Sequence, residues 1–202
     1  MSAQNVYKFN PDRGFAGGIY DLAPHEINTF LNEENTGAME FGIGVVGGTV
    51  AGKQIKKPAS TAEAGDFLGI TVNNRTTTYD LEGVVHILKD AAVGVMKYGR
   101  IWAKVAEGEA PAFGDAVYLI TDGEEASHFA KAAGSYTAVQ LANCTFVTAA
   151  ENGVAVIEIA NAPAAGSPTY TLPAATASAL GGVKVGTGLS VTADGTLSVA
   201  GE

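Results

Sequence analysis

Short runs of alternating apolar and polar residues, separated by glycine-containing turns, cover most of this chain. The clearest stretch is residues 91–123, AAVGVMKYGRIWAKVAEGEAPAFGDAVYLITDG. Val93 and Val95 lie on the same face of the first predicted strand. In the next strand, one face carries Ile101, Ala103 and Val105, and the other carries Arg100, Trp102 and Lys104. We predict three strands here, with turns at residues 97–99 and 114–115. Closely spaced strands with glycine turns favour a small β-barrel or sandwich over βαβ units.

Further strands are expected on both sides of this stretch. The segments that carry the pattern are residues 39–48, 49–59, 65–72, 84–90, 144–150 and 153–161. Residues 25–34, HEINTFLNEE, fit a helix through Ile27, Phe30 and Leu31, or a strand through alternate residues, and the pattern leaves both open. Residues 124–138 are polar and alanine-rich, and we expect them to form a surface excursion.

The first 24 residues have neither a helical nor a strand period. Four large apolar residues lie among glycines and prolines in this segment: Phe9, Phe15, Ile19 and Tyr20. A disordered leader is one interpretation. The apolar content favours an arm that becomes ordered on a partner, with these four side chains as its contacts.

The character of the chain changes after Asn161. Residues 162–168, APAAGSP, are typical of a linker, and residues 169–202 carry almost no charge. Asp194-Gly195 predicts a hairpin turn. Six apolar residues around it follow the same alternating pattern: Val183, Val185, Leu189, Val191, Leu197 and Val199. A segment this short needs support to fold. We therefore predict that the six residues form the core of an intertwined, trimeric stalk; a flexible low-complexity tail is the alternative.

Composition narrows the choice of partners. Charged residues make up 16% of the chain, glycine occurs 26 times in 202 residues, and the net charge is −9. Low charge suggests that much of the surface is buried against other chains, whereas the negative balance argues against nucleic acid and anionic membranes. No signal peptide and no long apolar run is found, so we expect synthesis in a cytoplasm. The single cysteine, Cys144, is interpreted as a small buried hydrophobe.

No catalytic, cofactor or metal site is expected. Residues 47–53, GGTVAGK, match the first seven positions of a phosphate-binding loop, but Gln54 stands where Ser or Thr would bind Mg²⁺. His25, His86 and His128 have no partners at metal-ligand spacing. The sequence contains no recognised nucleophile motif either, so we predict that the protein is not an enzyme.

Five segments, in order and spacing, resemble the structural cement (capsid decoration) proteins of tailed bacteriophages. They lie between Gly14 and Asn161: FGIGVVGG, DFLGITV, VGVMKYGRIWAKV, FGDAVYLI and CTFVTAAENGVAVIEIAN. Separately, LPAATASALGGVKVGTGLSVTADGTLSV resembles a segment of phage head-fibre and tail-fibre proteins. Since the chain stops at Glu202 without a distal receptor-binding domain, a short spike is expected.

The resemblance implies an all-β protein: a small β-barrel or sandwich with an extended N-terminal arm and a trimeric, fibre-like C-terminal segment. We divide the chain into an arm (1–24), a cement domain (25–161), a linker (162–168) and a stalk (169–202). The implied function is decoration of the outer surface of the mature phage capsid, bridging capsomers. The implied partners are the major capsid protein and further copies of the chain, as a homotrimer. A baseplate or tail-fibre component that binds host glycans is the alternative.

Overall fold

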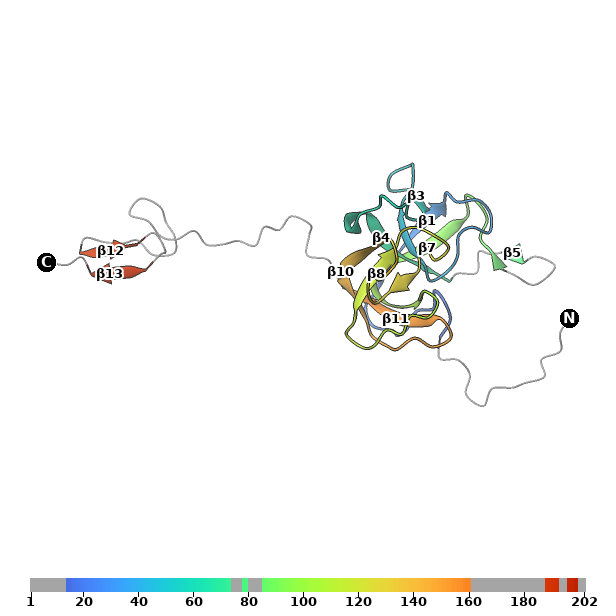
Figure 1. Ribbon diagram of the computed structural model, residues 1–202. Coiled ribbons are helices and arrows are strands. Elements are labelled where there is room, and N and C mark those ends of the chain that lie inside the picture. The colour runs from blue at the N-terminus through green and yellow to red at the C-terminus, as the bar shows by residue number, and fades with distance from the viewer. Residues whose placement is uncertain (1–13, 74–77, 80–84, 161–187, 193–195, 200–202) are drawn as a thin grey trace. The chain divides into compact units, whose positions relative to one another are not determined.

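The computed structural model describes residues 14–73, 78–79, 85–160, 188–192 and 196–199 (Figure 1). The chain divides into two units, Met1–Ala162 and Pro163–Glu202, which are described separately. Strands and one short 3₁₀ helix make up the regular structure of the described residues, which confirms the all-β prediction. None of these residues forms a helix long and apolar enough to cross a membrane.

The strands of the first unit are β1 (Glu26–Asn32), β2 (Gly44–Gly47), β3 (Gln54–Lys56), β4 (Phe67–Val72), β5 (Thr78–Tyr79), β6 (Val85–His86), β7 (Ala92–Lys104), β8 (Ala116–Ile120), β9 (Phe129–Ala130), β10 (Ala138–Phe146) and β11 (Val154–Ile159). The 3₁₀ helix η1 (Ala64–Asp66) precedes β4. Nine of these strands form one sheet in the order β1-β3-β2-β4-β7-β11-β10-β8-β9, while β5 and β6 form a separate ribbon.

The sheet closes on itself, which makes the body a β-barrel. Strand β1 pairs with β3 on one side and with β7 on the other, so β1, β3, β2, β4 and β7 form a closed circuit. Beyond β7, the strands β11, β10, β8 and β9 curl back until Phe129 of β9 bridges Val105 at the end of β7. Strand β7 is therefore common to both circuits.

Two clusters of buried apolar side chains fill the two circuits. The first comprises Phe30, Met39, Ile43, Val45, Ile55, Ile87, Val93 and Val95. The second includes Ile70, Met96, Ile101, Ala103, Val105, Val117, Leu119, Phe129, Leu141, Cys144, Phe146, Ala155, Ile157 and Ile159. The predicted alternation of Ile101, Ala103 and Val105 is confirmed, because all three face this second core.

The predicted turn at residues 97–99 is wrong. The chain stays extended as one strand, β7, because β1 pairs with its first half and β11 with its second half. The glycine at position 99 instead marks a bend within the strand. Glu26 pairs with Tyr98 but Ile27 pairs with Met96, so Lys97 is an extra residue, and Gly99 adopts φ +119°. This bend turns the odd-numbered residues of β7 from the first core to the second.

Two other expectations are settled by tertiary contacts. Residues 25–34 contain a strand, β1, because the edge of β7 is available to pair with it. The expected surface excursion at residues 124–138 is wrong for β9, since Phe129 and Ala130 are fully buried. Phe129 stacks edge-to-face on Phe67, with ring centroids 6.4 Å apart. Two apolar residues within a polar segment are too few to show the alternation that would predict a strand.

The loop that resembles a phosphate-binding loop already holds a carboxylate of the protein itself. Glu33 accepts hydrogen bonds from the backbone N–H and the hydroxyl of Thr49, the latter at 2.7 Å. These bonds lower the pKa of Glu33, the backbone bond contributing most. The loop connects β2 and β3.

The second unit contains an antiparallel pair, β12 (Leu189–Val191) and β13 (Leu197–Val199). The register places Leu189 opposite Val199 and Val191 opposite Leu197, and between them the hydroxyls of Ser190 and Ser198 lie 2.8 Å apart. Leu189 is 41% exposed and Val199 is 77% exposed. Val183 and Val185, the other two predicted stalk residues, lie outside the described residues.

The close approach of β4 to β7 yields a stability prediction. A Cβ on Gly69 would lie 2.2 Å from the carbonyl oxygen of Met96, a backbone atom that cannot move aside easily. Gly69→Ala is therefore expected to lower the free energy of unfolding by about 1–3 kcal/mol. Gly47→Ala is the matched control, because nothing lies within 4 Å of its Cβ position. Equal urea denaturation midpoints for the two variants would contradict this packing.

Candidate interaction surface

Residues 14–22, which we name the strap, run along β7 at the edge opposite to β11. Ile19 forms an antiparallel bridge with Ile101. The Tyr20 N–H donates to the Arg100 carbonyl at 3.0 Å, and the Trp102 N–H donates to the Gly18 carbonyl at 2.9 Å. The N–H of Gly17 donates to the carbonyl of Trp102 at 2.7 Å. These bonds hold the strap on the barrel of its own chain.

This finding corrects one expectation about the N-terminal arm. We expected residues 1–24 to order only against a partner, but residues 17–20 are bonded to β7 within a single chain. Phe9 lies outside the described residues. The other three predicted contact residues, Phe15, Ile19 and Tyr20, belong to the strap.

The strap passes directly over Trp102, and its small residues make this possible. A Cβ on Gly14 would lie 2.1 Å from atoms of the Trp102 ring, so only glycine fits at this crossing. Tyr20 stacks edge-to-face on the same ring, with centroids 5.7 Å apart. Below the ring lie Val154 and Val156 of β11, and Trp102 is only 6% exposed. Trp102 therefore packs between the strap and β11.

The strap leaves large apolar side chains on the surface. Phe15 is 62% exposed, Ile19 43%, Tyr20 42% and Leu22 99%. Beside them lies an open cavity of about 470 Å³, lined by strap residues, the Trp102 ring and the loop of residues 148–151. We call this area the strap surface. The sequence indicated three of its apolar side chains, whereas Leu22 was missed although it lies in the same glycine- and proline-rich segment.

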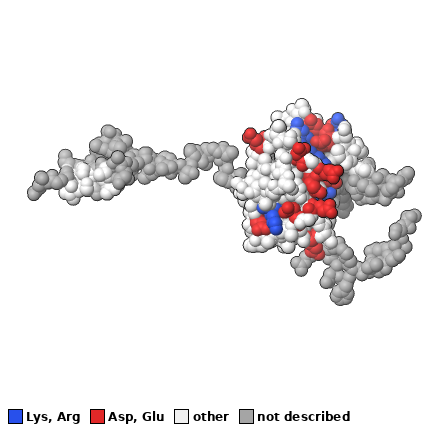
Figure 2. Space-filling view, viewed as in Figure 1, with Lys and Arg blue, Asp and Glu red and all other residues white. Residues whose placement is uncertain are grey.

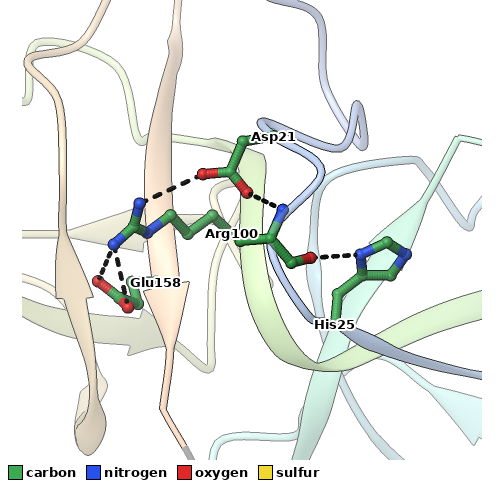
Figure 3. Close-up of polar contacts among 5 residues, drawn as sticks. Asp21, His25, Arg100 and Glu158 are labelled. Carbon is green, nitrogen blue, oxygen red and sulfur yellow. Dashed lines mark hydrogen bonds and ion pairs between the residues drawn. The ribbon is translucent and has the colours of Figure 1, made fainter.

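An ion-pair network fixes the end of the strap. Arg100 contacts Asp21 at 3.2 Å and Glu158 of β11 at 3.4 Å (Figure 3). Asp21 also accepts the Ala23 N–H at 3.1 Å, and the His25 ring contacts the Ala23 carbonyl at 2.9 Å. Glu158 first and Asp21 second raise the pKa of Arg100, so its guanidinium remains charged. One arginine thus joins the strap to two strands of the barrel.

The comparisons with known proteins agree with this architecture. Residues 3–160 match the family described as structural cement protein (E217 gp24/Pam3 gp6). The chain belongs to this family of phage structural cement proteins. The match includes the strap and the whole barrel and ends before the second unit. It confirms the resemblance of residues 14–161 to cement proteins. No curated protein matches the chain.

A solved structure shows that the fold of this cement protein is found in a capsid. A chain of the structure titled "The capsid of Myoviridae Phage XM1" aligns with a TM-score of 0.65 and 22% identity. The alignment covers 80% of this chain and 99% of that one. The cement protein is accordingly a phage structural protein by family, and it shares its β-barrel fold with a chain of that capsid.

The polar residues considered in the sequence have structural partners. The imidazole of His128 contacts Glu125 and lies 3.6 Å from Glu40. Burial raises the pKa of Cys144 to about 12, which suits a small apolar core residue. Among the described residues no group of three His, Cys, Asp or Glu side chains could hold a metal ion. Acidic side chains outnumber basic ones on the face shown in Figure 2.

The role of Arg100 in fixing the strap is testable. Arg100→Met should release Asp21, so the amide of Tyr20 should exchange with deuterium roughly two- to five-fold faster than in the wild type. Core amides such as that of Ile157 should be unchanged. Lys97→Met, an exposed charge on the same strand, is the control. Faster exchange throughout the barrel would mean that Arg100 stabilises the whole fold instead of the strap.

Proposed function

We propose that this cement protein binds the outside of the mature phage capsid through the strap surface and stabilises the head by bridging capsomers. The observation that carries the proposal is the exposure of Phe15, Ile19, Tyr20 and Leu22 on one backbone-bonded segment. Monomeric proteins rarely expose contiguous apolar patches, which usually mark interaction sites. The major capsid protein is the partner that membership of a cement family indicates.

The structure of the strap favours tight attachment. Binding costs free energy when loops must become ordered, and pre-organised segments avoid much of that cost. Backbone hydrogen bonds to β7 and the Arg100 network hold the strap before any partner is present. The aromatic rings of Phe15 and Tyr20 supply contact area with few rotatable bonds.

Bridging explains how modest contacts would stabilise a whole capsid. A ligand that binds only one lattice state shifts the equilibrium toward that state by mass action. When one copy touches several capsomers, the second contact is intramolecular and its effective concentration is high. We therefore expect decoration to act on the stability of the mature capsid more than on its assembly.

For the second unit we propose a homotrimeric stalk that projects outward from the capsid. A two-stranded hairpin alone is marginally stable in water. The exposed Leu189 and Val199 leave apolar surface that further copies of the same hairpin would cover. The six alternating residues from Val183 to Val199 are the proposed core. The alternative of a glycan-binding tail component has less support, because the single tryptophan is buried.

The strap surface can be tested by replacing two exposed apolar side chains with serine. Ile19→Ser should weaken binding to undecorated, expanded capsids roughly ten-fold or more, because a contact residue loses its apolar side chain. Val50→Ser is the control, since Val50 is similarly exposed at 46% but lies in the turn between β2 and β3. Because exposed ion pairs contribute only ~0–1 kcal/mol each, wild-type affinity should change little in raised salt. Equal capsid affinities for both variants would exclude the strap surface as the contact.

Deleting residues 168–202 separates the roles of the two units. The shortened protein should still raise the temperature at which capsids release DNA, because the barrel and strap are retained. In light scattering it should lose the trimeric mass expected of the full chain. If the shortened protein no longer decorates capsids, the second unit is the anchor; if its mass per particle remains trimeric, the stalk does not hold the copies together.

A further inference from the structure

We propose that the outer edge of the strap at Ile19 accepts an extended segment of the major capsid protein as an added β-strand. This inference rests on the proposed function and specifies how the strap surface would engage its partner. In strand addition, main-chain hydrogen bonds provide affinity, and pockets for alternate side chains provide specificity.

The register between the strap and β7 determines which way the N–H and C=O groups of Ile19 point. In an antiparallel pair, residues directly opposite each other either exchange both hydrogen bonds or form none with each other. Ile19 and Ile101 are of the second kind, because the bonds are made by their neighbours, Tyr20 to Arg100 and Trp102 to Gly18. The N–H and C=O of Ile19 therefore point away from β7.

Within the described part of the chain, no residue bonds to the N–H or C=O of Ile19. The same holds for the backbone of Asp21, so the unpaired stretch extends beyond one residue. On the other side of Ile19 the Gly17 carbonyl is occupied, since it accepts the Asn73 N–H at 2.8 Å. The open edge thus begins at Ile19 and continues toward Leu22.

Other strands of the nine-stranded sheet have partners on both edges for at least part of their length. Strand β1 pairs with β7 from Glu26 to Leu31 and with β3 at Leu31 and Asn32. Strand β9 pairs with β8 and is tied to β7 through the Val105 bridge. The strap occupies the remaining edge of β7, and from Ile19 to Leu22 its own outer edge has no backbone partner among the described residues. Unpaired strand edges are templates for another chain.

The surroundings of the edge define the chemistry of the segment that fits. The cavity of about 470 Å³ beside Ile19 is lined by Phe15, Tyr20 and Trp102, so it suits an aromatic or large aliphatic side chain. Glu151 lies on the same lining and would meet a Lys or Arg of the segment. We expect an extended apolar segment with one basic residue.

The experiment removes a single backbone donor. Replacing Ile19 by its α-hydroxy acid keeps the side chain and turns the N–H into an ester oxygen. We expect this ester variant to bind expanded capsids roughly five- to ten-fold more weakly than the wild type. The same ester at Ala51, an exposed turn residue, should bind like the wild type. In the wild type, the Ile19 amide should exchange with deuterium more slowly on the capsid than in the free protein.

The outcomes separate this inference from the proposed function. If the ester variant binds like the wild type while Ile19→Ser binds weakly, the strap surface is the contact but no strand is added, and the inference is wrong. If both variants bind like the wild type, the proposed function is wrong as well. A photo-crosslinker at Leu22 should form adducts with the major capsid protein; adducts only with a second copy of this chain would overturn the assigned partner.

Discussion

The hydrogen bonding of β7 is the constraint on which the rest of the body depends. A strand of thirteen residues from Ala92 to Lys104 has two edges, and both need partners along its length. Strands β1 and β4 satisfy the first half, and β11 and the strap satisfy the second. Because one strand serves both circuits, the two hydrophobic cores cannot form independently of each other. The bend at Gly99 directs successive parts of β7 into one core and then the other.

The strap connects this constraint to function. Its backbone covers part of β7, and Gly14 allows it to cross the Trp102 ring closely. Once the inner edge of the strap is bonded, its large side chains have no remaining place in the core and stay on the surface. Arg100 then links Asp21, near the end of the strap, to Glu158 of β11. The same contacts that complete the barrel therefore also hold the apolar strap surface that we propose as the capsid contact.

The chemistry of the chain fits a structural role in a lattice. A low fraction of charged residues favours burial of surface against other proteins, and a net charge of −9 disfavours an anionic partner such as nucleic acid. The polar clusters that the structure does contain, such as Glu33 with Thr49 and Arg100 with Asp21 and Glu158, bind parts of the chain to one another. Each has a structural explanation.

Local patterns in the sequence were sufficient for the fold class and for much of the surface. Alternation with period two depends only on neighbouring residues, so it correctly identified the core-facing side of the strand around Ile101 and the all-β class. The same reasoning singled out Phe15, Ile19 and Tyr20 as unusual, because apolar residues without a period have no core to join.

What the tertiary structure decided depends on residues far apart in the chain. Residues 97–99 bend instead of turning because β1 and β11 hold β7 extended on both sides of Gly99. Phe129 is buried because β8 and the end of β7 enclose its short strand. The strap is ordered because its backbone meets an open edge some eighty residues later in the sequence. Hydrogen bonds and burial between such distant segments depend on how the whole chain closes, and no local window of sequence contains that information.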